Sequence, residues 1–176
     1  NSGYTLLAMV VNRVSGLTLR QFAKKSIFEP RGMRDTEFLD DRFEILPNVA
    51  SGYRHARSSA WSPSPYLNDT YGPGGLFTTA LDMLRWYTSF TDSTPSLTRS
   101  HLTNGDSIPY AMGLDLGRYR GNRYAGHGGN DLGASAYGMR FLDRGLSVVV
   151  LCNAREFDSY TLARRVADLF LPPPVA

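Results

Sequence analysis

A series of β-strand patterns in the second half of the chain places the strongest constraint on its fold. Segments rich in Val, Tyr and Leu predict strands at 110–119, 123–126, 134–142 and 146–153. The tripeptide 143–145, Asp-Arg-Gly, predicts a tight hairpin that makes the last two strands antiparallel neighbours. The short connections predict a meander, and therefore one antiparallel sheet.

Helical patterns lie on both sides of these strands. Residues 4–14 are apolar nearly all round, which predicts a helix that is buried on most of its faces. Thr, Leu, Arg and Gln at 18–21 have the spacing of a capping box and predict a second helix, which Pro30 ends. Similar signals predict a third helix over 79–90 and a closing helix over about 159–171.

Helices followed by an antiparallel meander and a closing helix indicate an α+β fold, with an antiparallel sheet and flanking helices. The length of 176 residues suits one domain, 1–176. Its helical part is expected over about 1–92, and its sheet and closing helix over about 108–171. Residues 31–78 show no sustained period, and so long an irregular segment is typical of a wall or lid over a site.

Charge and composition exclude several classes of protein. The net charge is +3 and the basic residues are scattered, whereas a nucleic-acid surface needs them clustered. No apolar stretch approaches the ~20 residues that span a bilayer, so no membrane span is expected. The three histidines, His55, His101 and His127, are too dispersed for a metallohydrolase helix, and no phosphate-binding loop is present. We expect no metal and no cofactor.

The candidate site is the glycine-rich segment around His127. Glycines at 126, 128 and 129 flank this histidine. Glycine in a strand permits a close approach to the backbone, so a substrate could lie along the strand edge with the Asn130 N–H as an oxyanion-hole donor. The alternative is a tight turn that requires glycine, with a histidine that hydrogen-bonds a neighbour. These residues alone favour neither interpretation.

No activated nucleophile is evident in the chain. A nucleophile elbow, Gly-x-Ser-x-Gly, fails because Ser135 is followed by Ala136 and Tyr137. No serine is followed by lysine three residues later, the spacing that places a hydroxyl and an amine on one helix face.

Three segments nevertheless carry a family resemblance. Residues 126–141, GHGGNDLGASAYGMRF, resemble the third motif of the penicillin-recognising serine hydrolases, a group that contains class C β-lactamases, D-amino-acid peptidases and related esterases. That motif is Lys-Thr-Gly in many members and His-x-Gly in others. Residues 27–38, IFEPRGMRDTEF, are similar to the family's Pro-Leu-Gly-Met-x-Asp-Thr segment, with Arg31 where leucine is common. Residues 71–87, YGPGGLFTTALDMLRWY, match its Gly-Gly-Leu-x-Ser-Thr-Ala-x-Asp helix start.

The first residues, NSGYTLL, resemble the tail of the family's second motif, Tyr-Ser/Ala-Asn, and the segment after it. The resemblance implies that Asn1 is the asparagine of that motif, and that its tyrosine and the Ser-x-x-Lys nucleophile precede it. The chain is therefore expected to be the C-terminal portion of such a hydrolase. Its β-lactamase/DD-peptidase-like fold would be incomplete at the N-terminal side.

The resemblance also implies roles for individual residues. Asn1 would hydrogen-bond the substrate amide, and His127 would line the site opposite it in place of the family's lysine. Gly128 and Gly129 would border the substrate, and the Asn130 N–H would supply half of the oxyanion hole.

Aromatic residues of the long irregular segment have two interpretations. Tyr53, Tyr66 or Tyr71 would shape the substrate pocket, or they would serve only as packing aromatics. Their positions in the sequence do not separate the two.

The resemblance implies a whole protein that forms an acyl-enzyme on an ester, amide or β-lactam, with esterase or peptidase activity favoured by His-x-Gly. This chain alone is expected to be inactive because it lacks the nucleophile. The alternative is a non-catalytic module that binds a substrate or peptidoglycan. Expected partners are an acyl substrate and either the N-terminal remainder or a second copy, paired with the exposed edge of strand 146–153. No compartment is predicted.

Overall fold

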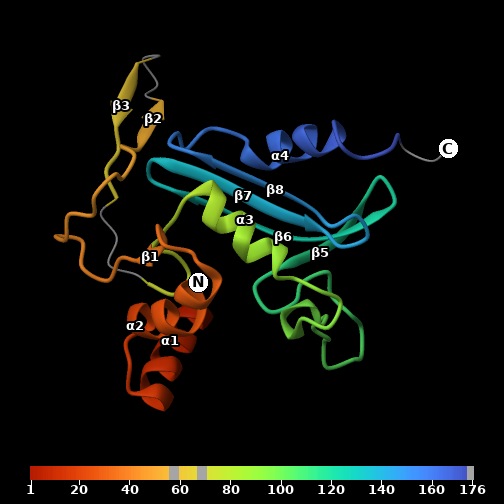
Figure 1. Cartoon of the computed structure of the whole chain (residues 1–176), viewed down its shortest axis with the longest axis horizontal. Coiled ribbons are helices and arrows are strands. Elements are labelled where there is room, and N and C mark those ends of the chain that lie inside the picture. The colour runs from red at the N-terminus through yellow and green to blue at the C-terminus, as the bar shows by residue number, and fades with distance from the viewer. Residues whose placement is uncertain (56–59, 67–70, 174–176) are drawn as a thin grey trace.

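A four-stranded antiparallel sheet forms the centre of the molecule, with a helix on each face (Figure 1). The computed structural model describes residues 1–55, 60–66 and 71–173. The strands lie in the order β5-β6-β7-β8, so each pairs with its neighbour in sequence. Their bounds are Asp115–Tyr119, Asn122–Asp131, Ala134–Phe141 and Leu146–Cys152. This confirms the predicted α+β fold and its meander.

Two helices cover the sheet, and each buries a separate apolar cluster. Helix α3, Ala80–Thr88, lies on one face, and its Tyr87 packs with residues that include Ala125 of β6. Helix α4, Ser159–Asp168, lies on the other face, where a second cluster includes Met139 and Phe141 of β7. Because successive strand residues point to opposite faces, every β6 side chain belongs to either the α3 face or the α4 face.

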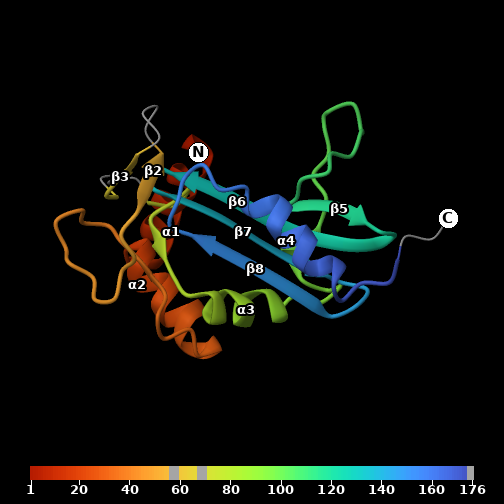
Figure 2. The same ribbon diagram turned by 90° about the horizontal axis from the view of Figure 1, so that it is seen from above.

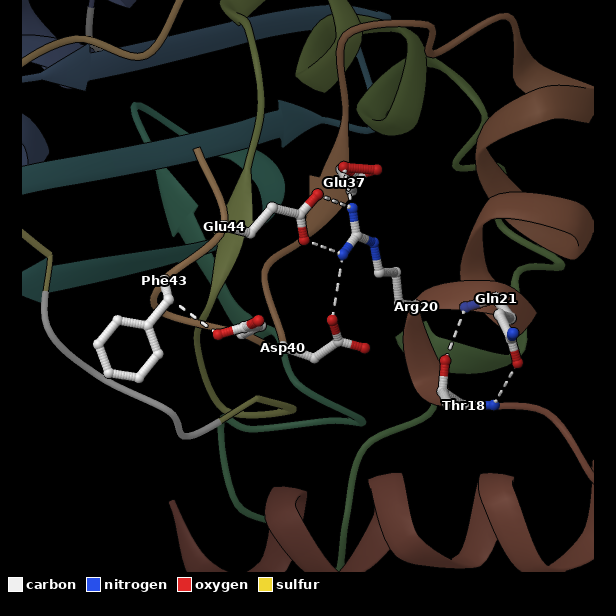
Figure 3. Close-up of polar contacts among 8 residues, drawn as sticks. Thr18, Arg20, Gln21, Glu37, Asp40, Phe43 and Glu44 are labelled. Carbon is white, nitrogen blue, oxygen red and sulfur yellow. Dashed lines mark hydrogen bonds and ion pairs between the residues drawn. The ribbon is translucent and has the colours of Figure 1, made fainter. Parts of the chain in front are cut away.

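The N-terminal helices follow the predicted signals closely. Helix α1, Ser2–Ser15, ends at Gly16, which adopts the left-handed conformation. Helix α2, Leu19–Ala23, opens on the capping box, in which the Thr18 hydroxyl accepts from the Gln21 N–H and the Gln21 side chain accepts from the Thr18 N–H (Figure 3). The helix continues as a π-helical turn, Lys24–Phe28, and a 3₁₀ turn, Glu29–Arg31. The prediction that Pro30 ends it is wrong, because Pro30 lies within the first residues of the 3₁₀ turn, where its missing N–H is tolerated.

Helix α1 differs from expectation in its burial. Only Ala8 is fully buried, whereas apolar side chains along most of the helix are exposed in the described chain. Those that are more than half exposed are Leu6, Leu7, Met9, Val10 and Val14. The prediction of a helix buried on most faces is therefore wrong here, because the described residues pack against only one side of it. We call these five residues the exposed α1 face.

Four short strands organise the irregular segment. Strand β1, Glu37–Phe38, pairs with β4, Leu76–Phe77, and β2, Tyr53–His55, pairs with β3, Trp61–Pro63. The segment is fastened to α2 by Arg20, whose guanidinium contacts three carboxylates, those of Glu37, Asp40 and Glu44 (Figure 3). The hydrogen bond with Arg20 lowers the pKa of Glu44.

Asp82 of α3 makes a second, buried connection to the same segment. Its backbone N–H donates to the Thr79 hydroxyl, as the helix-start pattern predicts. Its carboxylate, however, accepts from the Asp35 N–H at 2.8 Å and the Thr36 hydroxyl at 2.9 Å, and pairs with Arg85. The Asp82 side chain therefore holds residues 35–36 against α3, rather than completing a capping box.

Candidate functional site

The glycine-rich segment lies inside strand β6. The sequence predicts this strand only over 123–126, but it runs from Asn122 to Asp131. Gly126, Gly128 and Gly129 all have strand conformations, with none in the left-handed region. The tight turn of the alternative interpretation is therefore wrong, although the histidine does hydrogen-bond a neighbour, Tyr110, as that interpretation expects.

Strand β6 extends past β5 and leaves one edge without a strand partner. The pairing with β5 stops at Gly126, opposite Asp115, whereas the pairing with β7 continues to Asp131. In Figure 2, β6 runs on well beyond the short β5. Within the described residues, no strand pairs with 127–131 on the β5 side. Alternate residues of this stretch, which we call the open edge, present backbone N–H and C=O groups outward.

Two of the glycines are required by packing against β7. A Cβ on Gly128 would lie 2.6 Å from the Tyr137 ring, and one on Gly126 would lie 2.7 Å from the Gly138 carbonyl oxygen. Gly129 differs, because a Cβ there would meet nothing within 4 Å. Gly129 thus leaves open space on the open edge, on the sheet face that also carries His127.

His127 lies on the α3 face and is connected to the start of α1 by two tyrosines. Its side chain is exposed, and its Nε2 lies 3.2 Å from the Tyr110 hydroxyl. The Tyr110 hydroxyl lies 3.4 Å from that of Tyr4, in the first turn of α1. The contacts thus bring together His127 and a residue 123 positions earlier in the chain.

A third tyrosine packs beside the strand position of His127. Tyr87 of α3 packs over Gly138, where a Cβ would approach its ring to 2.2 Å. Gly138 is the register partner of His127, so the Tyr87 ring lies against the strand pair that carries His127. Burial raises the pKa of Tyr87 to about 12, so this group stays protonated at neutral pH. Tyr4, Tyr87 and Tyr110 are site residues that the sequence patterns did not indicate.

Asn1 and Tyr71 lie near the first turn of α1. The Asn1 carbonyl accepts from the Tyr4 and Thr5 N–H groups, while its side chain makes no capping hydrogen bond. Tyr71 precedes Gly72, whose missing Cβ would lie 2.7 Å from the Tyr4 carbonyl oxygen. Both residues therefore lie at the end of α1 from which Tyr4 reaches toward Tyr110 and His127.

Tyr53 lies at the turn beyond the open edge. Its N–H donates to the carbonyls of Gly133 and Asn153, and it forms a parallel bridge with Ala154. These contacts fasten the β2–β3 hairpin to the β6–β7 turn and to the end of β8. Apart from this contact, the outer edge of β8 has no strand partner in the described residues.

A hollow of about 500 Å³ lies on the α4 face, between the sheet and the residues that precede α4. It is lined by residues that include Gly128, Asn130, Tyr137, Glu156 and Tyr160. Because Gly128 points to the face opposite that of His127, this hollow and the His127 side chain lie on different sides of β6.

The described residues gather no group of three histidine, cysteine or acidic side chains that could hold a metal ion. None of their helices combines the length and apolar character needed to cross a membrane.

Comparisons with known proteins agree over most of the chain. A family model described as Beta-lactamase matches residues 1–171. Penicillin-binding protein 4* of Bacillus subtilis is 27% identical, over 93% of this chain and 41% of its own length. A D-aminopeptidase of Brucella anthropi is also 27% identical, over 87% of this chain and 31% of its own.

A solved structure shows the same fold. The octameric penicillin-binding protein homologue from Pyrococcus abyssi superposes with a TM-score of 0.80 at 25% identity. The match covers 96% of this chain and 41% of that one. This chain thus spans well under half the length of each of these three relatives.

Proposed function

This chain belongs to the Beta-lactamase family, and on that premise we propose that it forms one wall of the acylation site of a serine hydrolase. The open edge of β6 is the observation that carries the proposal. It offers outward backbone groups beside an exposed imidazole, with open space at Gly129. A substrate can pair with such an edge as an added strand does.

Each site residue has a role in this proposal. The Asn130 N–H donates to the oxyanion that develops on the attacked carbonyl, and a backbone donor of this kind contributes about 3 kcal/mol. His127 binds the substrate or assists proton transfer from the α3 face. Asn1 and Tyr71, near the Tyr4 end of α1, form the facing side of the groove. Gly128 and Gly129 keep the strand free of side chains along the substrate.

The substrate class that we propose is an amide or peptide of a D-amino acid. The support is the D-aminopeptidase relative, which matches 87% of this chain, including the His-x-Gly strand. An amide substrate presents an N–H and a C=O, which are the groups that a strand edge pairs with.

The nucleophile is proposed to come from residues outside this sequence. No Ser-x-x-Lys occurs among the 176 residues, and the relatives are more than twice as long as the part that matches. The exposed α1 face supports the same proposal, because a contiguous group of exposed apolar side chains is typical of a surface that another segment covers.

A fluorophosphonate or a labelled penicillin tests this proposal, because each labels an activated serine. The 176-residue chain alone should form no covalent adduct, since losing the nucleophile removes the acyl-enzyme route. The extended polypeptide, meaning this chain with the residues that its gene encodes before Asn1, should be labelled at one serine. The readout is the mass of the intact protein, followed by a peptide map.

The outcomes separate the candidate functions. Stable serine labelling of the 176-residue chain would show that the nucleophile lies within it. A reading frame that begins at this chain, or an extended polypeptide that binds penicillin reversibly without an adduct, would overturn the hydrolase proposal and favour a non-catalytic binding module.

A further inference from the structure

His127 is fixed at its ring by a hydrogen-bonded pair of tyrosines. The Tyr110 hydroxyl lies 3.2 Å from the His127 Nε2, and the two rings are 6.0 Å apart in an edge-on arrangement. The Tyr4 hydroxyl lies 3.4 Å behind that of Tyr110. Among the described residues, no side chain or backbone group hydrogen-bonds the His127 Nδ1.

The chemistry of the groups sets the direction of these hydrogen bonds. A neutral imidazole has one N–H and one bare nitrogen, and each phenol has a single O–H. A phenol is the stronger donor, and the bare imidazole nitrogen is the stronger acceptor. Tyr110 therefore donates to the Nε2 of His127, and Tyr4 donates to the oxygen of Tyr110. This direction leaves the imidazole proton on Nδ1.

Tyr110 keeps its proton over the range in which a hydrolase would work. Burial, followed by the hydrogen bond with Tyr4, raises the pKa of Tyr110 to about 12. Its hydroxyl thus remains a donor at neutral pH. Tyr4 comes from α1 and Tyr110 from the segment before β5, so two separate parts of the fold position one ring.

We propose that Tyr110, supported by Tyr4, is a positioning residue that holds His127 as the Nδ1–H tautomer beside the open edge. The Nδ1–H is then available to donate to a substrate oxygen, while the Nε2 is occupied. The importance of this arrangement for catalysis rests on the proposed function. The tautomer itself is a property of this chain and is measured without any substrate.

Nuclear magnetic resonance of the imidazole nitrogens tests the proposal. The chain has three histidines, so a sample labelled with ¹⁵N-histidine gives three sets of ring signals. His127→Gln removes one set and thereby assigns it. Above pH ~8, where histidine is normally neutral, the His127 Nε2 should have the chemical shift of a bare nitrogen and the Nδ1 that of an N–H.

Substitution of the tyrosines gives the decisive comparison. Tyr110→Phe should shift His127 toward the Nε2–H form that histidine favours in water, and Tyr4→Phe should cause a smaller shift in the same direction. Tyr119→Phe is the matched control, because its hydroxyl bonds Asp168 instead. This variant should leave the His127 signals unchanged.

Two results would overturn the inference. One is a His127 that already carries its proton on Nε2, and the other is a Tyr110→Phe spectrum identical to that of the unsubstituted chain. Solid-state spectra of sedimented protein give the same shifts if the chain self-associates. The tautomer measurement requires no nucleophile. It can therefore contradict the tautomer proposal while serine labelling supports the proposed function, or support the tautomer proposal while serine labelling fails.

Discussion

Replacing His127 by alanine in the extended polypeptide should slow acylation by about 100- to 10,000-fold, the range typical of a positioned acid–base group. The change removes the only imidazole at the open edge among the described residues. It leaves the strand pairing with β5 and β7 in place. The measurement is the second-order rate constant for labelling by a penicillin or fluorophosphonate.

His101→Ala is the matched control for this experiment. His101 is also exposed, but it lies in a separate bridge with Ser107. The His101→Ala variant should be labelled at the same rate as the unsubstituted extended polypeptide. If both variants are labelled at equal rates, His127 has no role in the site. If circular dichroism shows that His127→Ala is unfolded, the role of His127 is structural.

Asp82→Ala should lower the free energy of unfolding by about 3 kcal/mol, the largest stability effect that we expect from a single side chain. The Asp82 side chain is fully buried and accepts hydrogen bonds from the Asp35 N–H and the Thr36 hydroxyl. Alanine would leave the Asp35 N–H without this acceptor, and the buried Thr36 hydroxyl would keep only the Thr78 hydroxyl as a partner. Urea unfolding, monitored by tryptophan fluorescence, gives the difference in free energy of unfolding between the variant and the unsubstituted chain.

Two further variants show whether burial of the Asp82 carboxylate causes the expected loss of stability. Asp82→Asn keeps one acceptor oxygen and should lose roughly half as much stability. Asp106→Ala removes an exposed carboxylate and should change stability by less than about 0.5 kcal/mol. An Asp82→Ala chain as stable as Asp106→Ala would show that the connection from α3 to residues 35–36 contributes nothing.

Local patterns predicted the elements whose causes are local. The capping box at Thr18 and the hairpin at 143–145 depend on neighbouring residues, and both are present in the structure. Strand β6 was predicted too short because glycine lowers strand propensity, whereas packing against Tyr137 and Gly138 is what requires glycine there. The single-domain prediction for 1–176 stays a prediction.

The contacts of the candidate site could not be predicted from the spacing of residues in the sequence. Tyr4 and Tyr110 are 106 residues apart, and no periodicity connects them. The sequence pattern at 79–82 predicts only the start of a helix, whereas the Asp82 carboxylate accepts from residues 46 and 47 positions away. Such pairs depend on where the whole fold places α1 and α3, which local sequence patterns do not determine. His127 was found only because glycines surround it.

A crystal structure of the extended polypeptide with penicillin bound covalently tests the central claim most directly. The account predicts that the acyl carbonyl oxygen lies about 3 Å from the Asn130 backbone nitrogen, with the acyl chain along residues 127–131 on the side that carries His127. An acyl group in the hollow on the α4 face, or one that makes no contact with the open edge, would contradict the account.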